Sequence, residues 1–203
     1  MDKILLVGAG GHARACIDVI ETENQFEIAG LIEKNESMTD MNLGYPIIGN
    51  DSDLSDLRQQ YSYALITVGQ IKSSKVRIKL YQLLKEFGFT LPVVISPKAY
   101  VSKYAQISEG TIIMHGAIVN ANAKIGKNCI INNKALIEHD TAIGSHCHIA
   151  TGSIINGEVS IGNGTFIGSG AITKQCISIG DDCIVGAGVI IKSDITPNQV
   201  VKN

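Results

Sequence analysis

Three consecutive residues, Glu138, His139 and Asp140, interrupt a stretch of small and aliphatic side chains that reads ALIEHDTAIG. An imidazole has an ordinary pKa of about 6.5, so it can accept a proton near neutral pH. An adjacent carboxylate can fix the tautomer of the ring and stabilise its charged form. The residue types therefore predict a general base, His139, that is assisted by Asp140 or Glu138.

The position of this histidine is set by a six-residue repeat that fills the second half of the chain. Every sixth residue from Val101 to Ile191 is Val or Ile, apart from Thr173. Such unbroken self-similarity at a short period is typical of a solenoid. Ile137 is one of the repeated aliphatic residues and should face the core, so His139 is expected on the outside.

This repeat resembles the hexapeptide-repeat family over roughly residues 100–196. The resemblance implies a left-handed parallel β-helix, in which three hexapeptides complete a triangular coil of 18 residues, and it implies a trimer. A second apolar column supports the trimer, because a soluble monomer rarely exposes a large apolar patch and closed symmetry would bury it. This outward column comprises Ile112, Ile118, Ile130, Leu136, Ile154, Phe166, Ile172, Ile184 and Ile190.

Residues 18 apart should be neighbours on successive coils. The neighbours of His139 are then Gly157 on one side and Ala121 on the other, so the ring has room on both sides. A ligand can approach the backbone N–H of a glycine closely. A base beside such a donor is what direct acyl transfer needs, with the Gly157 N–H as the oxyanion donor.

Residues 1–95 have a different pattern, in which the strand-like segments KILLVGAG, FEIAGLIE and YALITVG alternate with helix-like segments. Together they predict a small Rossmann-like α/β domain before a β-helix domain at 96–203. The helix KVRIKLYQLLKEFGF is expected to bury one face, formed by Val76, Leu80, Leu83, Leu84 and Phe87.

A glycine-rich turn follows the first strand of this domain. Gly8, Gly10 and Ala13 have the G-x-G-x-x-A spacing of a dinucleotide site, and the acidic Glu33 follows. However, the domain has only about 90 residues, half of a doubly wound unit, and no hydride-transfer site follows it. The N-terminus of the next helix still favours phosphate, so a nucleotide sugar is expected there rather than NAD.

Taken together, GAGGHARACIDVIE and the later INNKALIEHDTAIGSHCHIATGSIINGEV resemble the bacterial acetyltransferases that modify nucleotide-linked amino sugars or sialic acids. The resemblance implies a homotrimer with active sites between adjacent subunits and a role in surface glycan biosynthesis. It implies acetyl-CoA as co-substrate, His139 as the base with Asp140, and Gly157 as the oxyanion donor. No Cys or Ser is placed as a nucleophile beside His139, so direct attack without an acyl-enzyme is expected.

The same resemblance assigns further residues to ligands. Acetyl-CoA would contact His148, Ser169 and Ala187. The nucleotide sugar would contact Asn132, Gly10, Gly11 and His12, with Glu33 and Lys34 at the uracil end and Gly69 and Gln70 at the next strand end.

Two other functions stay open at this point. The same base would serve the O-acetylation of a sialic or related nonulosonic acid, although the phosphate-type loop favours the amino group of a UDP- or GDP-linked 4-amino sugar. A non-catalytic scaffold or a γ-carbonic-anhydrase-like metal protein is the third possibility. No metal is expected, because His146 and His148 are only two residues apart and His115 is remote.

Composition limits the remaining possibilities. The chain has 203 residues, a formal net charge of −2, and 18% charged residues. This balance gives no electrostatic basis for binding nucleic acid or an anionic membrane. The apolar run near the N-terminus is too short for a signal peptide or a membrane span. Five cysteines without a C-x-x-C pair suit reduced thiols, and we expect a cytoplasmic protein.

Overall fold

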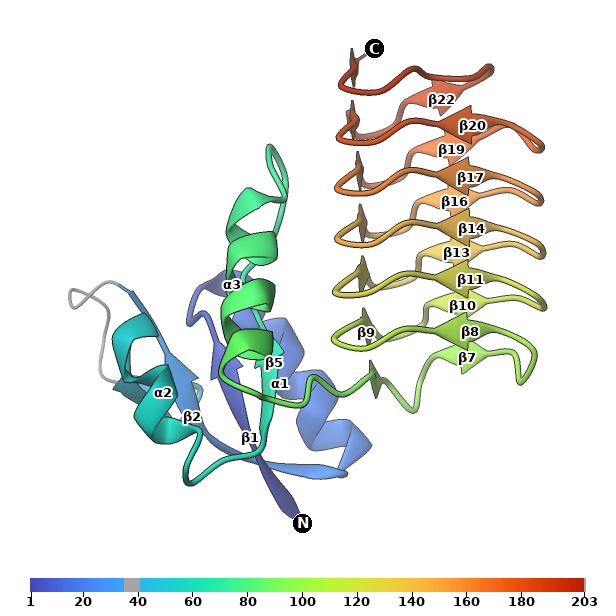
Figure 1. Cartoon of the computed structure of the whole chain (residues 1–203). Coiled ribbons are helices and arrows are strands. Elements are labelled where there is room, and N and C mark those ends of the chain that lie inside the picture. Colours follow the sequence, from blue (N-terminus) through green and yellow to red (C-terminus); the bar gives the residue numbers. More distant parts are fainter. Residues whose placement is uncertain (35–40, 203) are drawn as a thin grey trace.

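Two bodies of parallel strands make up the computed structural model, which describes residues 1–34 and 41–202 (Figure 1). An α/β unit lies beside a tall triangular prism. The unit holds the strands β1 (Asp2–Val7), β2 (Phe26–Ile32), β3 (Met41–Asn42), β4 (Tyr45–Gly49) and β5 (Tyr63–Ile66), in the order β3-β4-β2-β1-β5. Its helices are α1 (Gly11–Glu23), η1 (Asp51–Asp53), α2 (Leu54–Leu57) and α3 (Lys75–Glu86).

The central strands of this sheet are parallel and buried on both faces. Ile4, Leu5, Leu6 and Val7 of β1 have no exposed surface, which explains why the strand reads as a continuous apolar run. The sequence predicted β1, β2 and β5. It did not predict β3 and β4, where β3 pairs antiparallel with β4.

The predicted inward face of α3 is confirmed at Leu80 and Leu84, which are buried, and at Leu83 and Phe87, which pack against the same core. It is wrong at its first position. Val76 is 58% exposed, whereas Arg77 is buried. Burial of this guanidinium is possible because Nη1 donates to the carbonyls of Ile66 and Val68, and Nη2 donates to the carbonyl and side-chain oxygen of Asn128. Asn128 belongs to the prism. Arg77 therefore joins α3 and β5 to the second half of the chain.

The prism is a left-handed parallel β-helix, as predicted. Strands of neighbouring coils pair 18 residues apart, for example Ile118 with Leu136 and Val119 with Ile137. We call its three faces the docked sheet, the apolar sheet and the small-residue sheet. The docked sheet contains β6 (Val94–Ile95), β9 (Ile112–Ile113), β12 (Ile130–Ile131), β15 (His148–Ile149), β18 (Phe166–Ile167), β21 (Ile184–Val185) and β23 (Val200–Val201).

The other two faces are built in the same way. The apolar sheet contains β7 (Tyr100–Val101), β10 (Ile118–Val119), β13 (Leu136–Ile137), β16 (Ile154–Ile155), β19 (Ile172–Thr173) and β22 (Ile190–Ile191). The small-residue sheet contains β8 (Gln106–Ile107), β11 (Lys124–Ile125), β14 (Ala142–Ile143), β17 (Ser160–Ile161) and β20 (Ser178–Ile179). The repeated aliphatic residues from Ile113 to Ile191 are buried inside the prism.

Between positions 110 and 188, each corner of the prism turns through a residue with positive φ, and these residues also recur every six positions. Glycine occupies some of them, but Asn122, Asp140 and Glu158 stand at one column of corners with φ near 60° (61°, 59° and 61°). This left-handed conformation closes the turn between two strands. His139 immediately precedes Asp140, so the repeat places its ring at a corner.

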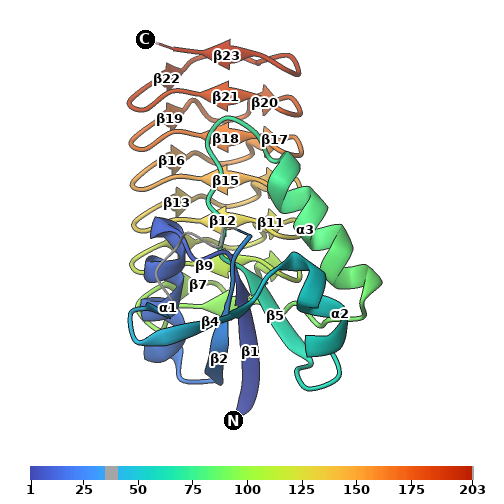
Figure 2. The same ribbon diagram turned by 90° about the vertical axis from the view of Figure 1, so that its left-hand side faces the viewer.

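The α/β unit packs on the docked sheet (Figure 2). Ile112, Met114 and Ile130 of the prism are fully buried in one cluster with Ile17 and Ile20 of α1. Part of the predicted outward column is therefore covered by the chain itself and not by another subunit. The reason is that consecutive outward positions belong to different faces of the prism, and one face receives the α/β unit.

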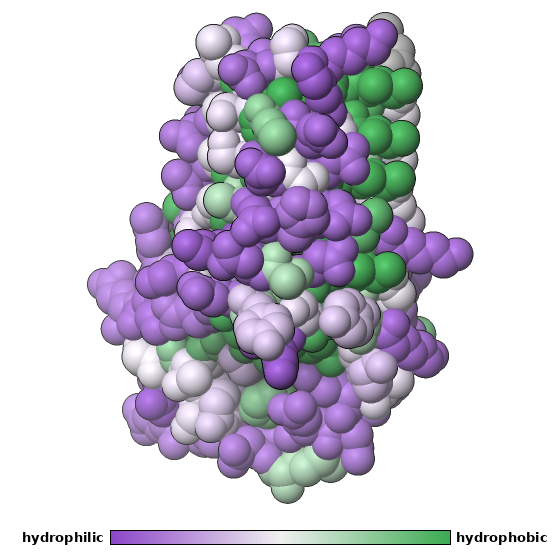
Figure 3. Space-filling view, turned by 90° about the vertical axis from the view of Figure 1, so that its right-hand side faces the viewer, coloured by the Kyte–Doolittle hydropathy of each residue, from purple (hydrophilic) through white to green (hydrophobic). Residues whose placement is uncertain are grey.

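The apolar sheet keeps its outward column. Ile118 is 40% exposed and Ile190 is 61% exposed, and Leu136, Ile154 and Ile172 lie between them, half-buried. Figure 3 shows hydrophobic side chains stacked along this part of the prism. This column is the surface on which the prediction of a trimer now rests. No helix in the described part of the chain is long and apolar enough to cross a bilayer.

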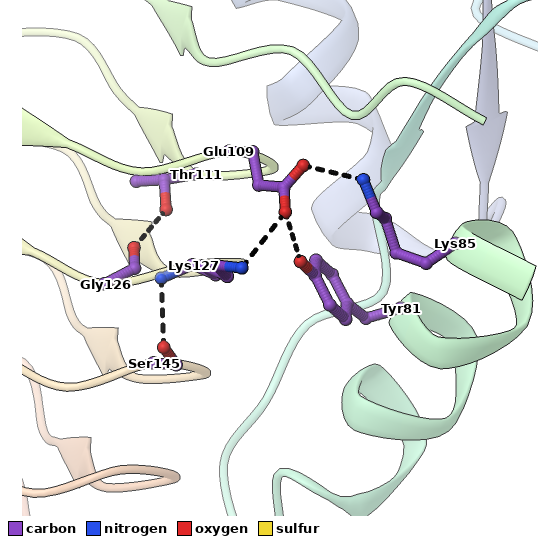
Figure 4. Close-up of polar contacts among 7 residues, drawn as sticks. All are labelled: Tyr81, Lys85, Glu109, Thr111, Gly126, Lys127 and Ser145. Atoms are coloured by element: carbon purple, nitrogen blue, oxygen red, sulfur yellow. Dashed lines mark hydrogen bonds and ion pairs between the residues drawn. The ribbon is translucent and has the colours of Figure 1, made fainter. Parts of the chain in front are cut away.

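Polar contacts fix the α/β unit against the prism. Glu109 accepts hydrogen bonds from Tyr81 (2.6 Å) and Lys85 (2.9 Å) of α3 and lies 3.4 Å from the ammonium of Lys127 (Figure 4). The hydrogen bond from Tyr81, followed by that from Lys85, lowers the pKa of Glu109 to about 2. At the opposite edge of the docked sheet, Nε2 of His115 lies 2.7 Å from Oδ2 of Asp18 of α1.

Candidate active site

His139 and Asp140 form a hydrogen-bonded pair at the corner between the apolar and small-residue sheets. Nδ1 of His139 lies 2.9 Å from Oδ2 of Asp140, and Nδ2 of Asn122 donates to Oδ1 of Asp140 at 2.6 Å. Since a carboxylate only accepts, Nδ1 carries the proton and Nε2 presents a lone pair. No described residue makes a hydrogen bond to Nε2, so it is available to a substrate.

The electrostatics of the pair favour a basic imidazole. The hydrogen bond to Asp140 raises the pKa of His139, and the hydrogen bond from Asn122 is the largest cause of a lowered pKa of Asp140. Glu138 is directed elsewhere, because its Oε2 accepts from Asn120 at 2.9 Å. Of the two acids left open by the sequence, Asp140 is therefore the one that contacts the ring.

Gly157 lies directly beside the imidazole, as the 18-residue spacing predicted. A Cβ atom at Gly157 would lie 2.8 Å from Cε1 and 2.9 Å from Nε2 of His139. Only a glycine at position 157 leaves enough space for the imidazole ring in this position. The carbonyl of Gly157 accepts from Cys176 in the coil ladder, but no described residue accepts its N–H. An unshielded backbone donor thus stands next to a basic nitrogen.

A second group of predicted residues meets in a cavity of about 420 Å³ at the carboxyl ends of the parallel strands of the α/β unit. Carboxyl ends of parallel strands are the usual place for ligands in such sheets. The lining includes the predicted residues Gly10, Gly11, His12, Glu33, Lys34 and Gly69. It also includes Asp51.

The glycines of the turn have separate physical roles. Gly8 has φ +113°, and a Cβ there would clash with Val68, so it permits the strand to turn. A Cβ at Gly10 or Gly11 would meet nothing within 4 Å. The helix α1 begins at Gly11 without a side-chain cap, so its first N–H groups remain open to an anion.

Glu33 orders this turn. Its carboxylate accepts from the N–H of Ala9 at 2.9 Å and from the N–H of Lys34 at 2.9 Å. Both carboxylate oxygens are therefore engaged with the backbone.

His148, on β15 of the docked sheet, is 7% exposed and faces the α/β unit. Its Nδ1 lies 2.6 Å from the carbonyl of Gln70, so this nitrogen carries a proton, and Nε2 accepts from Asn132 at 3.0 Å. Burial lowers the pKa of His148 to about 4. The ring is therefore a neutral group at pH 7, held in one tautomer. The side chain of Gln70 donates to the carbonyl of Gly164 and so faces the prism rather than the cavity.

His12 joins this neutral cluster. Its ring centroid is 6.3 Å from that of His148, and burial lowers its pKa to about 3. The buried Nε2 of His12 has no hydrogen-bond partner among the described residues. A polar atom of a ligand in the cavity would satisfy it.

The structure divides the predicted site into two halves within one chain. His139 stands at the corner opposite the docked sheet, whereas His148 belongs to the docked sheet and Asn132 directly follows its strand β12. The α/β unit with its cavity packs on this sheet. Ser169 and Ala187, both exposed, lie at the corner between the docked and apolar sheets. Sequence reasoning missed Asn122, although it precedes Asp140 by 18 residues and the repeat could have identified it. It also missed Asp51, for which the sequence carries no signal. In the described part of the chain, no group of three or more His, Cys, Asp or Glu could hold a metal ion.

Protein-family models match both halves of the chain. The PglD N-terminal domain matches residues 3–84. The bacterial transferase hexapeptide (six repeats) matches residues 104–139 and 122–157, and the hexapeptide repeat of succinyl-transferase matches residues 158–193.

Several solved structures are similar over nearly the whole chain. A variant of perosamine N-acetyltransferase from Caulobacter crescentus, in complex with CoA and GDP-perosamine, is 31% identical with a TM-score of 0.92, covering 98% of this chain and 93% of that chain. The acetyltransferase domain of PglB from Neisseria gonorrhoeae, in complex with acetyl coenzyme A, is 27% identical with a TM-score of 0.90, covering 98% and 94%. WeeI from Acinetobacter baumannii is 27% identical with a TM-score of 0.84, covering 100% and 98%. No curated protein matches the chain.

Proposed function

The chain belongs to the bacterial sugar acetyltransferases built from a PglD-type N-terminal domain and hexapeptide repeats, and we propose that it acetylates the amino group of a nucleotide-linked amino sugar. Acetyl-CoA is the co-substrate. The observation that carries the proposal is the contact of His139 with Gly157, because it puts a proton acceptor and an oxyanion donor side by side.

The reaction proceeds by direct attack. Nε2 of His139 accepts a proton from the sugar amine while the amine nitrogen attacks the thioester carbonyl carbon. The oxygen that becomes negative accepts a hydrogen bond from the N–H of Gly157. The C–S bond then breaks, and the imidazolium returns the proton to the leaving thiolate of CoA. Asp140 stabilises the imidazolium in between.

The cavity of the α/β unit holds the nucleotide. Its phosphates lie at the N-terminus of α1, against Gly10, Gly11 and the ring of His12. Phosphate oxygens suit this place because the helix start offers N–H donors and lacks a capping side chain. The neutral His12 and His148 contribute polarity without competing with His139 for the proton.

The two halves of the site meet in a homotrimer. The column on the apolar sheet supplies the hydrophobic contact between copies. One subunit then contributes His139, Asp140 and Gly157, and the next contributes His148, Asn132 and the nucleotide cavity. Acetyl-CoA lies between them and runs along the backbone of Ser169 and Ala187.

The test is an assay of CoA thiol release with three acceptors: a GDP-4-amino sugar, a UDP-4-amino sugar and a free sialic acid. Turnover with a nucleotide-linked amine supports the proposal, and turnover with the free acid alone overturns it. His139→Ala should lower kcat by roughly 10²- to 10⁴-fold while acetyl-CoA binding persists. A fully active His139→Ala variant would remove His139 from its role as base.

A further inference from the structure

Asp51 lines the nucleotide cavity, and its carboxylate has no hydrogen-bond partner in the described part of the chain. The residue is half-buried. We propose that Asp51 selects the base of the nucleotide, and that it selects guanine by accepting hydrogen bonds from two adjacent N–H donors. This inference rests on the proposed function and names the nucleotide of its substrate.

The order of the strands places Asp51 at the base end of the cavity. The diphosphate is held after β1, at the start of α1. From β1, the sheet continues to β5 on one side and to β2 and then β4 on the other. β5 leads to Gly69 and Gln70, and Gln70 contacts His148 on the prism. The sugar must point this way to reach the acetyl group, so the base points toward β2 and β4.

Asp51 follows β4, at the first position of η1. Glu33, which follows β2, is the other acid among the described residues that line the cavity, but both of its oxygens already accept backbone N–H groups. Within the described part of the cavity lining, Asp51 is therefore the acid whose carboxylate oxygens are both unused. A half-buried carboxylate without a donor favours a ligand that brings donors.

Guanine meets this requirement better than other common bases. Its N1–H and its 2-amino group point in the same direction and can bind one carboxylate in a bidentate manner. Uracil offers a single N–H flanked by two carbonyl oxygens, which a carboxylate repels. Adenine offers one amino donor beside an acceptor nitrogen. A site built for two donors rejects a ligand that lacks one of them.

The experiment measures dissociation constants of GDP, IDP and UDP for the full chain, by titration calorimetry. IDP retains N1–H and lacks the 2-amino group, so it separates guanine recognition from ribose or phosphate contacts. Wild type should bind GDP tighter than IDP, and IDP tighter than UDP. Asp51→Asn should weaken GDP by roughly 10- to 100-fold and leave UDP unchanged, since each bond to a charged group is of that order.

Asp56→Asn is the matched control, because Asp56 is an exposed aspartate of α2 outside the cavity lining. It should bind all three nucleotides as wild type does. Equal affinity of wild type for GDP and UDP would overturn the inference, as would an equal loss of all three ligands in Asp51→Asn. Guanine preference without acetyl transfer would contradict the proposed function alone. Acetyl transfer to a UDP sugar in preference to a GDP sugar would contradict this inference alone.

Discussion

The imidazole of His139 rests on the backbone of Gly157, so close that a methyl group there would overlap Cε1 and Nε2. The contact joins two successive coils of the prism. It couples the position of the proton acceptor to the identity of one residue on the next coil.

Gly157→Ala should therefore push the ring away from its place and lower kcat by at least about tenfold, because small displacements of a catalytic group are costly. Steady-state kinetics measure the loss, and thermal melting should show that the prism remains folded. Ala121→Gly is the control, since it lies on the opposite neighbouring coil and adds no atom. Equal activity of Gly157→Ala and wild type would mean that the contact has no part in the reaction.

Asp140→Asn should lower kcat and also lower the pKa of His139. The carboxylate raises this pKa, so its removal shifts the acid limb of the kcat/KM profile to lower pH. Asparagine tolerates the left-handed conformation at position 140, so the corner should persist. Glu138→Gln, whose side chain faces Asn120, should shift the limb much less, because the charge of Glu138 is a smaller cause of the raised pKa of His139. An unshifted acid limb in Asp140→Asn would show that Asp140 does not act on the ring.

Mixed trimers test the division of the site between subunits. His139→Ala and His148→Ala are each expected to be nearly inactive. In a random 1:1 mixture, a complete site forms where an intact His139 meets an intact His148 on the next subunit, which is about one interface in four. Co-expressed and purified mixtures should then recover about a quarter of wild-type activity. No recovery in mixtures proven to contain both chains would place both histidines in a site within one chain.

Glu109→Gln should lower the melting temperature at pH 7. Folding lowers the pKa of Glu109 to about 2, so its stabilisation is complete above the ordinary carboxyl pKa and is lost as the pH falls from about 4.5 toward 2. The difference in melting temperature between variant and wild type should accordingly shrink below about pH 4.5. Glu86→Gln, at an exposed position at the end of α3, is the control. A difference that stays constant from pH 7 to pH 3 would contradict this role.

The repeat could be predicted from the sequence, and so could the neighbours of His139, because a fixed repeat length determines which residues are neighbours on successive coils. Ile137 faces the core and Gly157 flanks the ring for the same reason. The same 18-residue spacing could also have identified Asn122 as a neighbour of Asp140.

The packing of the α/β unit on the prism could not be predicted. It depends in part on Arg77, which is buried in addition to the apolar residues of α3 because its donors find carbonyls on both halves. For the same reason, nothing in the sequence distinguished the covered residues Ile112 and Ile130 from the exposed Ile118. The free carboxylate of Asp51 depends on a loop whose position only the fold defines.

His139 lies at the corner of the prism opposite the docked sheet, whereas the nucleotide cavity belongs to the α/β unit that packs on the docked sheet. In the proposed assembly, a newly synthesised chain carries every reactive group but is inactive until it associates with other copies of itself. Dilution should then dissociate the trimer and inactivate the enzyme, and specific activity should rise with enzyme concentration until all chains are associated.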